Sequence, residues 1–409
     1  MKRSTRLMKV FGGVCICALM IGLTGCSPLL IGDMKFQMGD YPAATTALTT
    51  YLETHPDSFQ GHYMLGRTYL ETGDTEKALS MLQKALQLKP GDPEATIYLG
   101  LVYVAQDNYE MAIATLEKFN DKDRPVVESA VKKQITLLKI AQSKKLAKEA
   151  LAAEKSLAAA KPDSNTYAIC YYADMTQDKN LQAFSKALAA MTISNLSKVN
   201  AIRIVERLRL QALMDEMALG QSGVVDPKTA PRTGKLLGAE NIVTGTLSQD
   251  IQAVTALASA SRGRVIGNAA VTVKKDNFFQ LPGAIAADVV KMNNIPLNPA
   301  EANAIGAIHT KNMDAVLYYG KALDALDKED WKTALNYFNK AIAADPGFEL
   351  AILGRETCPD DSSDGMSSLD KMEPQQMKAQ IESNFNDAVE NQNAADEAVK
   401  DSLSGGGGH

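Results

Sequence analysis

Three glycines, a lysine and several hydroxyl side chains lie close together in the stretch GKLLGAENIVTGTLS, from Gly234 to Ser248. The backbone amides of a glycine-rich loop followed by Lys and Ser or Thr can cradle a phosphate group. The spacing here does not fit, because Leu236 follows Gly234-Lys235 where a hydroxyl residue is required. The structural alternative is that Gly238 ends a helix in the left-handed conformation. Residues 241–247 then form a buried strand in which Gly245 allows close packing.

Other side chains that commonly carry chemistry are few and scattered. The four histidines do not cluster; they are His55, His62, His309 and His409. The sequence contains no CxxC or HExxH pattern, and GQSG at 220–223 lacks the spacing of a nucleophile elbow. The sequence therefore predicts no catalytic residue, no metal, no cofactor and a protein that is not an enzyme.

The first 26 residues have the pattern of an export signal. Basic residues precede an apolar segment at 11–23 that is too short to cross a bilayer comfortably. The following Leu-Thr-Gly-Cys resembles a bacterial lipobox, which implies that Cys26 is lipidated and that residues 1–25 are removed. Ser27 in place of Asp favours anchorage at the periplasmic face of the outer membrane. The alternative is an ordinary export signal with an incidental cysteine.

Cysteine content and charge exclude further classes. Removal of the signal leaves Cys170 and Cys358, so at most one intramolecular disulfide can form, and the apolar run around Cys170 favours a buried thiol. The formal net charge is −5, and no strong basic field indicates a nucleic-acid partner.

A 34-residue period follows the signal. The middle unit, YMLGRTYLETGDTEKALSMLQKALQLKP, resembles the tetratricopeptide repeat, a pair of helices that stacks on its neighbours. We expect three such units over residues 27–124, with small residues where the two helices cross and a proline after the second helix. The signature residues are Gly32, Ala44, Leu65, Gly66, Tyr69, Ala78, Leu82, Pro90, Gly100 and Ala112.

A fourth unit of the same kind spans residues 313–348, with Ala334 and Pro346 in pattern positions and Lys321 where Leu is usual. Because an isolated helix pair cannot bury its apolar face, it must pack on a neighbour, and the preceding domain is the expected one. Arrays of such repeats present a groove to protein partners. The alternative reading is a spacer or docking scaffold, and a homo-oligomer is possible in either case.

A long helix is expected at 125–162, because residues 126–160 are rich in Ala, Lys and Leu and lack Gly and Pro. Its lysines fit either a solvated face on a connecting helix or contact with anionic lipid. The solvated face is the simpler interpretation.

Residues 163–295 alternate between strand-like and helical patterns. Strands are predicted at 166–175, 201–207 and within 238–248, with helices at 180–199 and after Arg207. A hairpin turns at Arg262-Gly263, and a helix follows it. This order predicts an α/β sandwich with helices covering a sheet.

The segments IRIVERLRLQALMDEMALGQSGVVDP and TGKLLGAENIVTGTLS resemble the CsgG family of curli-secretion lipoproteins and its FlgO and TolB-N-like relatives. The resemblance covers about a third of the chain, and its matching residues include Val205, Glu206, Arg207, Gln221, Gly223, Gly238 and Gly245. It implies a bacterial envelope protein connected with secretion, bound to the membrane by a lipid anchor.

One departure bears on function. Members of that family line a membrane pore with long hairpins, one of which follows the strand that matches residues 245–247. A membrane-spanning strand needs about 9–11 residues, and here only about a dozen residues separate Ser248 from the next predicted strand. We therefore expect a scaffold or accessory component, with a pore-forming channel subunit as the alternative.

The overall expectation is an α+β multidomain protein: a helical repeat solenoid, a linker helix, the α/β domain, a repeat-like helix pair and a mostly disordered acidic tail at 355–409. A weak amphipathic helix within that tail is expected at about 374–403.

Overall fold

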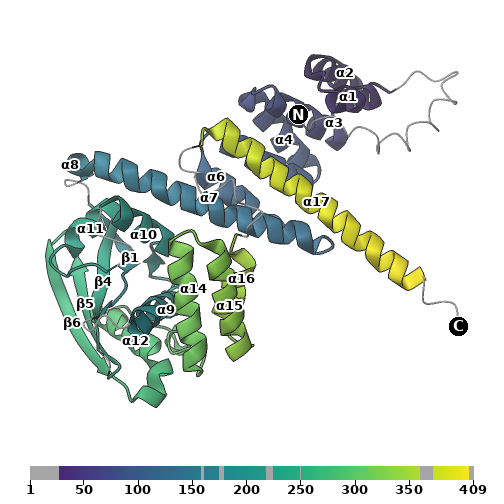
Figure 1. Cartoon of the computed structure of the whole chain (residues 1–409). Coiled ribbons are helices and arrows are strands. Elements are labelled where there is room, and N and C mark those ends of the chain that lie inside the picture. The colour runs from purple at the N-terminus through teal and green to yellow at the C-terminus, as the bar shows by residue number, and fades with distance from the viewer. Residues whose placement is uncertain are drawn as a thin grey trace, which may run out of the picture. The chain divides into compact units, whose positions relative to one another are not determined.

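The computed structural model describes residues 27–157, 161–174, 179–217, 224–248, 250–359 and 372–404. The chain divides into two compact units. The first runs to Asp107 and includes Lys118–Asn120; the second comprises Asn108–Glu117 and everything from Asp121 onward. A mostly helical repeat region is thus followed by a region with a mixed sheet (Figure 1). None of the described helices is both long and apolar enough to cross a bilayer.

The first unit is built from antiparallel helices. They are α1 (Pro28–Gln37), α2 (Tyr41–Thr54), α3 (Phe59–Glu71), α4 (Thr75–Leu88) and α5 (Pro93–Ala105). Gly39 and Gly73 turn the chain inside two repeats with φ of 76° and 78°. The next residues, Asp40 and Asp74, accept backbone N–H groups of α2 and α4 and so cap both helices.

Close crossings hold each helix pair together. A Cβ atom on Gly32 would lie 2.6 Å from the side chain of Leu48, and one on Gly66 would lie 2.7 Å from that of Leu82. The two pairs are related by the 34-residue period. Each repeat therefore needs a residue without a side chain where its helices meet.

The second unit starts with α6 (Tyr109–Leu116), α7 (Pro125–Ala152) and the short α8 (Glu154–Leu157). The long predicted helix thus ends at Ala152. Several of its lysines pair with acidic residues: Lys132 with Glu128, Lys139 with Glu117, Lys144 with Glu329, and Lys148 with Glu216. These pairs favour the connecting-helix interpretation over contact with lipid.

A mixed sheet forms the centre of the second unit. Its strands are β1 (Asp163–Ile169), β2 (Ala173–Asp174), β3 (Arg203–Ile204), β4 (Ala239–Leu247), β5 (Gln252–Ser259) and β6 (Arg264–Thr272). The order is β3-β1-β4-β5-β6, and β2 continues beside β4 beyond β1. β1, β2 and β3 run parallel to their partners, whereas β4–β5 and β5–β6 are antiparallel. The predicted strand at 201–207 is reduced to two residues, because α10 begins at Arg207.

Helices cover both faces of this sheet (Figure 1). Along β1, Tyr167 and Ile169 face the core that contains α9 (Lys179–Leu196) and α12 (Leu281–Met292). The alternate residues Ala168 and Cys170 face the core with α10 (Arg207–Glu216) and α11 (Ala230–Leu237). Successive side chains of a strand point to opposite faces of the sheet. Because helices cover both faces, the central strands are apolar on both sides. A 3₁₀ helix at Lys275–Gln280 leads into α12, and α13 (Pro299–Ala304) follows it.

The repeat-like pair near the C-terminus packs on this domain. It consists of α14 (Met313–Asp327) and α15 (Trp331–Ala344), followed by α16 (Glu349–Thr357). α14 lies directly against α9. At their crossing, a Cβ atom on Gly320 would lie 1.8 Å from the carbonyl oxygen of Ala183. The face with which α14 would otherwise meet a partner is occupied by α9.

The tail differs from the expectation of a mostly disordered segment. α17 (Pro374–Ser404) packs on α7, and its buried face consists of Met377, Ile381, Phe385 and Ala388. The Gln392 side chain accepts the backbone N–H of Val126 at 2.9 Å. Apolar residues spaced by three and four positions bury one stripe of a helix even when the other faces are acidic. The amphipathic helix expected at about 374–403 is thus confirmed, and its packing on α7 is what the sequence did not predict.

Candidate functional site

The repeat signature residues lie at helix crossings and helix ends. Leu65 and Ala78 are buried, Tyr69 is half-buried, and Gly100 is buried within α5. Ala44 and Ala112 are fully buried, as is Ala334 in α15. Pro90 and Pro346 follow the ends of α4 and α15. The signature residues therefore have a structural role in the repeats, and contacts with a partner would be made by other residues.

A cation surrounded by aromatic rings joins the first helices of the three repeats. The guanidinium carbon of Arg67 in α3 lies 4.7 Å from the ring centre of Phe36 in α1 and 4.4 Å from that of Tyr98 in α5. It also lies 5.5 Å from the ring centre of Tyr63, whose pKa burial raises to about 12. Each such contact contributes about 0.5–2 kcal/mol. The cluster thus connects α1, α3 and α5 through one side chain.

The CsgG-like signature residues are structural in the same sense. Val205 is buried, and Gly238 has φ of 68° as the left-handed end of α11. A Cβ atom on Gly245 would lie 2.2 Å from the carbonyl oxygen of Val254. These two glycines confirm the structural interpretation of the stretch from Gly234 to Ser248. Gln221, Gly223 and Cys26 lie outside the described residues.

Two signature residues make ion pairs. Glu206 pairs with Lys139 of α7 at 3.4 Å. Arg207, the first residue of α10, pairs with Asp327 at the end of α14. The Asp327 side chain is 0% exposed, and that of Arg207 is 13% exposed. The pair therefore connects the CsgG-like domain to the C-terminal helix pair through a nearly dry contact.

Lys186 of α9 and Tyr171 complete a buried polar cluster. The Lys186 ammonium lies 2.8 Å from Asp327 and 2.9 Å from Asp324, and its side chain is 7% exposed. The Tyr171 hydroxyl donates to Asp327 at 3.0 Å and accepts from Arg207 at 2.9 Å. Burial raises the pKa of Tyr171 far above its ordinary value. Asp327 thus serves three partners from separate elements, which satisfies a carboxylate buried away from water.

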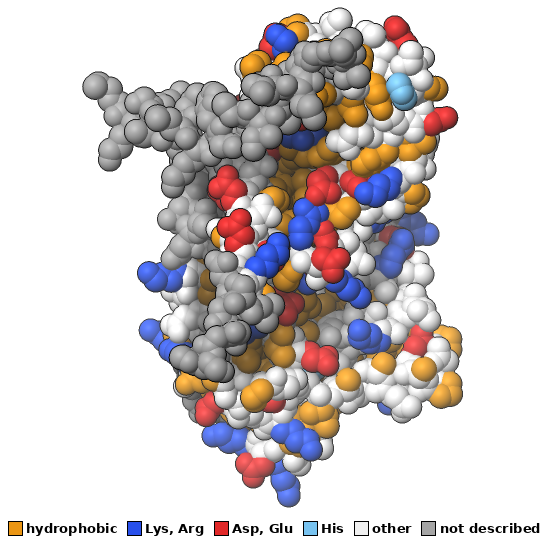
Figure 2. Space-filling model, turned by 90° about the vertical axis from the view of Figure 1, so that its right-hand side faces the viewer, with side chains coloured by type: hydrophobic (Ala, Val, Ile, Leu, Met, Phe, Trp, Pro, Cys, Tyr) orange, Lys and Arg blue, Asp and Glu red, His pale blue; other side chains and the backbone are white. Residues whose placement is uncertain are grey.

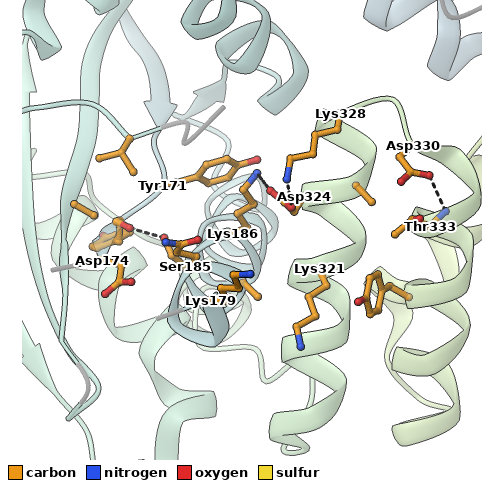
Figure 3. Close-up of a pocket in the computed structure, with 17 residues that line it drawn as sticks. Tyr171, Asp174, Lys179, Ser185, Lys186, Lys321, Asp324, Lys328, Asp330 and Thr333 are labelled. Atoms are coloured by element: carbon orange, nitrogen blue, oxygen red, sulfur yellow. Dashed lines mark hydrogen bonds and ion pairs between the residues drawn. The ribbon is translucent and has the colours of Figure 1, made fainter. Parts of the chain in front are cut away.

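A cavity of about 740 Å³ lies between α9 and the pair α14–α15, and Tyr171, Lys186 and Asp324 of this cluster form part of its wall (Figure 3). Lys179 comes from the α9 side and Lys321 from the α14 side. The lining also includes Asp324, which Lys328 contacts at 2.7 Å, and Asp330, which caps α15 through the backbone N–H of Thr333. The rest of the wall includes Tyr172, Asp174, Gln182, Val224 and Tyr337.

Two polar side chains of the pocket, those of Ser185 and Lys186, already have partners within the protein. The Ser185 hydroxyl is already donated to the carbonyl oxygen of Tyr172 at 2.7 Å. Lys186 is held between two carboxylates, and these bonds also keep the pKa of Asp324 below its ordinary value against the opposing effect of burial. In the part of the chain that is described, no group of three His, Cys, Asp or Glu residues can hold a metal ion.

Surface charge is mixed. On the face shown in Figure 2, basic and acidic side chains are interspersed over the described residues, with hydrophobic side chains in the hollows between them. This pattern is unlike the single-sign field of a nucleic-acid-binding face. Cys170 and Cys358 are free and buried, and burial raises the pKa of the Cys170 thiol to about 12.

Sequence reasoning missed Asp327, Lys186 and Tyr171. No motif marks them, and Asp327 is separated from Arg207 by 120 positions. The sequence indicates only that an isolated repeat unit must pack on a neighbouring domain. It does not identify the residues that make this contact.

Comparison with known families matches both parts of the chain. The model for the curli production assembly/transport component CsgG matches residues 139–280. Two tetratricopeptide repeat models match residues 29–93 and 70–132. No curated protein matches.

Solved structures with partial likeness include a Thermobaculum terrenum O-GlcNAc transferase mutant, 18% identical over 46% of this chain and 39% of that chain, with a TM-score of 0.24. A tetratricopeptide repeat protein from Parabacteroides merdae is 15% identical over 81% of this chain and 82% of that chain, with a TM-score of 0.22. Yeast Tom70 is 14% identical over 88% of this chain and 73% of that chain, with a TM-score of 0.25. The chain spans less than half the length of the transferase.

Proposed function

We propose that this chain, which carries tetratricopeptide repeats followed by a CsgG-family domain, is a non-enzymatic scaffold of a bacterial envelope assembly connected with curli-type secretion. It is anchored through lipid on Cys26 at the periplasmic face of the outer membrane. Its three N-terminal repeats dock a protein partner.

The short length of the connection between β4 and β5 favours a scaffold over a channel subunit. Ser248–Ile251 is the whole connection, and the ladder resumes from Leu247 to Ala253. A membrane-spanning hairpin needs about 9–11 residues in each strand. β4 is covered by helices on both faces, and its residues are buried or half-buried. This domain therefore supports an assembly without contributing a pore at this position.

The repeats supply the docking part of the proposal. The first helices α1, α3 and α5 lie side by side and are joined by the contacts of Arg67. Stacked repeats of this kind present continuous surfaces to extended peptides or helices of a partner. The C-terminal pair α14–α15 is not proposed as part of that surface, because α9 packs against α14.

Three experiments test the proposal. The lipidated full chain is reconstituted into liposomes, and single-channel conductance is recorded; we expect none, and stable unitary currents would establish the channel alternative. Crosslinked pull-down from envelope membranes is expected to recover envelope proteins. The docking surface is tested by comparing the wild type with Arg67→Gln, and equal recovery by both would exclude a role for this surface.

A further inference from the structure

The first repeat exposes apolar side chains that the later repeats bury. Leu30 and Met34 of α1 are 60% and 48% exposed. Shifted by the 34-residue period, Leu30 corresponds to Met64 and Tyr98, which are 7% and 8% exposed. Met34 corresponds to Thr68 and Val102, both 0% exposed. Met38, one turn beyond Met34, is 70% exposed.

The difference arises from what precedes each repeat. The second helix of the preceding repeat covers the first helix of the next one, as α2 covers α3 and α4 covers α5. No described helix stands before α1, since the described chain begins at Ser27. Leu30, Met34 and Met38 are spaced by four positions and share one side of the helix. We call these three residues the end face. Terminal repeats usually carry a polar outer side for solubility, and this one does not.

The position of the end face in the chain indicates its occupant. Leu30 is four residues from Cys26, so the chain between them spans at most about 14 Å. Acyl chains on Cys26 would therefore hold α1 at the surface of the bilayer, where its apolar side chains can insert about 5–10 Å into the interface. The tether already keeps the helix near the lipid, so even weak contact is favoured by a high effective concentration.

We propose that the end face of α1 rests on the lipid surface and fixes the orientation of the first repeats relative to the membrane. This inference depends on the lipid anchor of the proposed function. α1 contains one basic residue, Lys35, and one acidic residue, Asp33, so attraction to anionic headgroups contributes little. The contact is therefore apolar and insensitive to the anionic lipid content of the membrane.

A fluorescent label tests the contact in the full lipidated chain. Leu30→Cys is labelled with an environment-sensitive fluorophore; Cys170 and Cys358 are both 0% exposed and protected from the reagent, and lipidation consumes the Cys26 thiol. The control is Gln87→Cys, an exposed position on α4. Both proteins are reconstituted into vesicles of phosphatidylethanolamine and phosphatidylglycerol that carry a quencher near the start of the acyl chains.

We expect the label at position 30 to shift to the blue and to be quenched several-fold more than the label at position 87, with the same result in purely zwitterionic vesicles. A water-like label at position 30 in protein that floats with the vesicles would overturn the inference and leave the anchor intact. A blue-shifted label that the lipid quencher does not reach would also overturn it, in favour of a protein partner or a second copy. Absence of acyl chains on Cys26 by mass spectrometry would remove both proposals.

Discussion

Asp327, the last residue of α14, forms an ion pair with Arg207, the first residue of α10, and neither side chain has substantial contact with solvent. The two residues come from parts of the chain that match different patterns, one a CsgG-like signature and the other a repeat-like helix pair. Their contact, with Lys186 and Tyr171 as further partners, shows that the C-terminal pair is built into the α/β domain.

Removing the carboxylate of Asp327 is expected to destabilise the second unit strongly. Asp327→Asn leaves Arg207 and Lys186 without their buried counter-charge, which costs about 3–5 kcal/mol. Urea denaturation monitored by hydrogen exchange of α9 and α14 peptides measures the loss. The control is Asp324→Asn, whose side chain is 40% exposed, so that water can replace much of the lost interaction and a smaller loss is expected. Equal losses in the two variants would show that the buried cluster has no special role.

A methyl group on Gly320 is expected to separate α14 from α9. The Cβ atom of Gly320→Ala would lie 1.8 Å from the carbonyl oxygen of Ala183, and backbone cannot move aside as a side chain can. We expect loss of protection from hydrogen exchange in both helices. Gly347→Ala is the matched control, because its Cβ atom would meet its nearest neighbour at 3.5 Å. A Gly320→Ala protein with wild-type protection would disprove the close crossing.

The crossing of α3 and α4 predicts a rescue. Gly66→Ala places a Cβ atom 2.7 Å from Cγ of Leu82, and Leu82→Ala alone costs about 2–5 kcal/mol. In the double variant the smaller side chain at 82 relieves the clash, so its loss should fall short of the sum by about 0.5–3 kcal/mol. Exchange rates of α3 and α4 peptides in the full chain report the effect. Strict additivity would indicate that the two residues do not meet.

His309 is expected to make stability depend on pH. Burial lowers its pKa below the ordinary value near 6.5, and its Nε2 lies 2.9 Å from the amide oxygen of Asn195. The folded state therefore binds this proton more weakly than the unfolded state does. The resulting stability is present above pH 6.5 and is lost as the pH falls from there through the folded pKa. The urea midpoint should fall further between pH 7.5 and pH 5.5 for wild type than for His309→Gln, whereas His55→Gln should behave as wild type does.

Local signals in the sequence predicted local structure well. Gly238 and Gly263 both have positive φ, at the end of α11 and between β5 and β6, where the chain must turn and only a residue without a side chain does so at no cost. The 34-residue period likewise located the crossings at Gly32 and Gly66, because small residues recur wherever helix pairs meet. These features depend on neighbours a few positions away.

Contacts between distant segments could not be predicted in this way. Nothing around Gly320 indicates that Ala183 lies against it, and nothing around Asp327 shows that it is buried, since aspartate at a helix end is usually solvated. The amphipathic helix at α17 was predicted, but nothing around Met377 and Ile381 indicates that α7 is the helix they pack against. In each case the contacting residue is more than a hundred positions away in the chain. A single sequence does not show which distant residues come into contact.

The close fit of α14 on α9 also sets an order of events as the chain folds. α9 ends at Leu196, and the helix that covers it begins at Met313. When the chain emerges from its N-terminus, the sheet and its first helices can assemble early, but the side of α9 that packs on α14 stays open until residues near Asp327 are available. An export or folding chaperone would find its longest-lived binding surface there, and any chain cut short before α14 would carry that surface permanently.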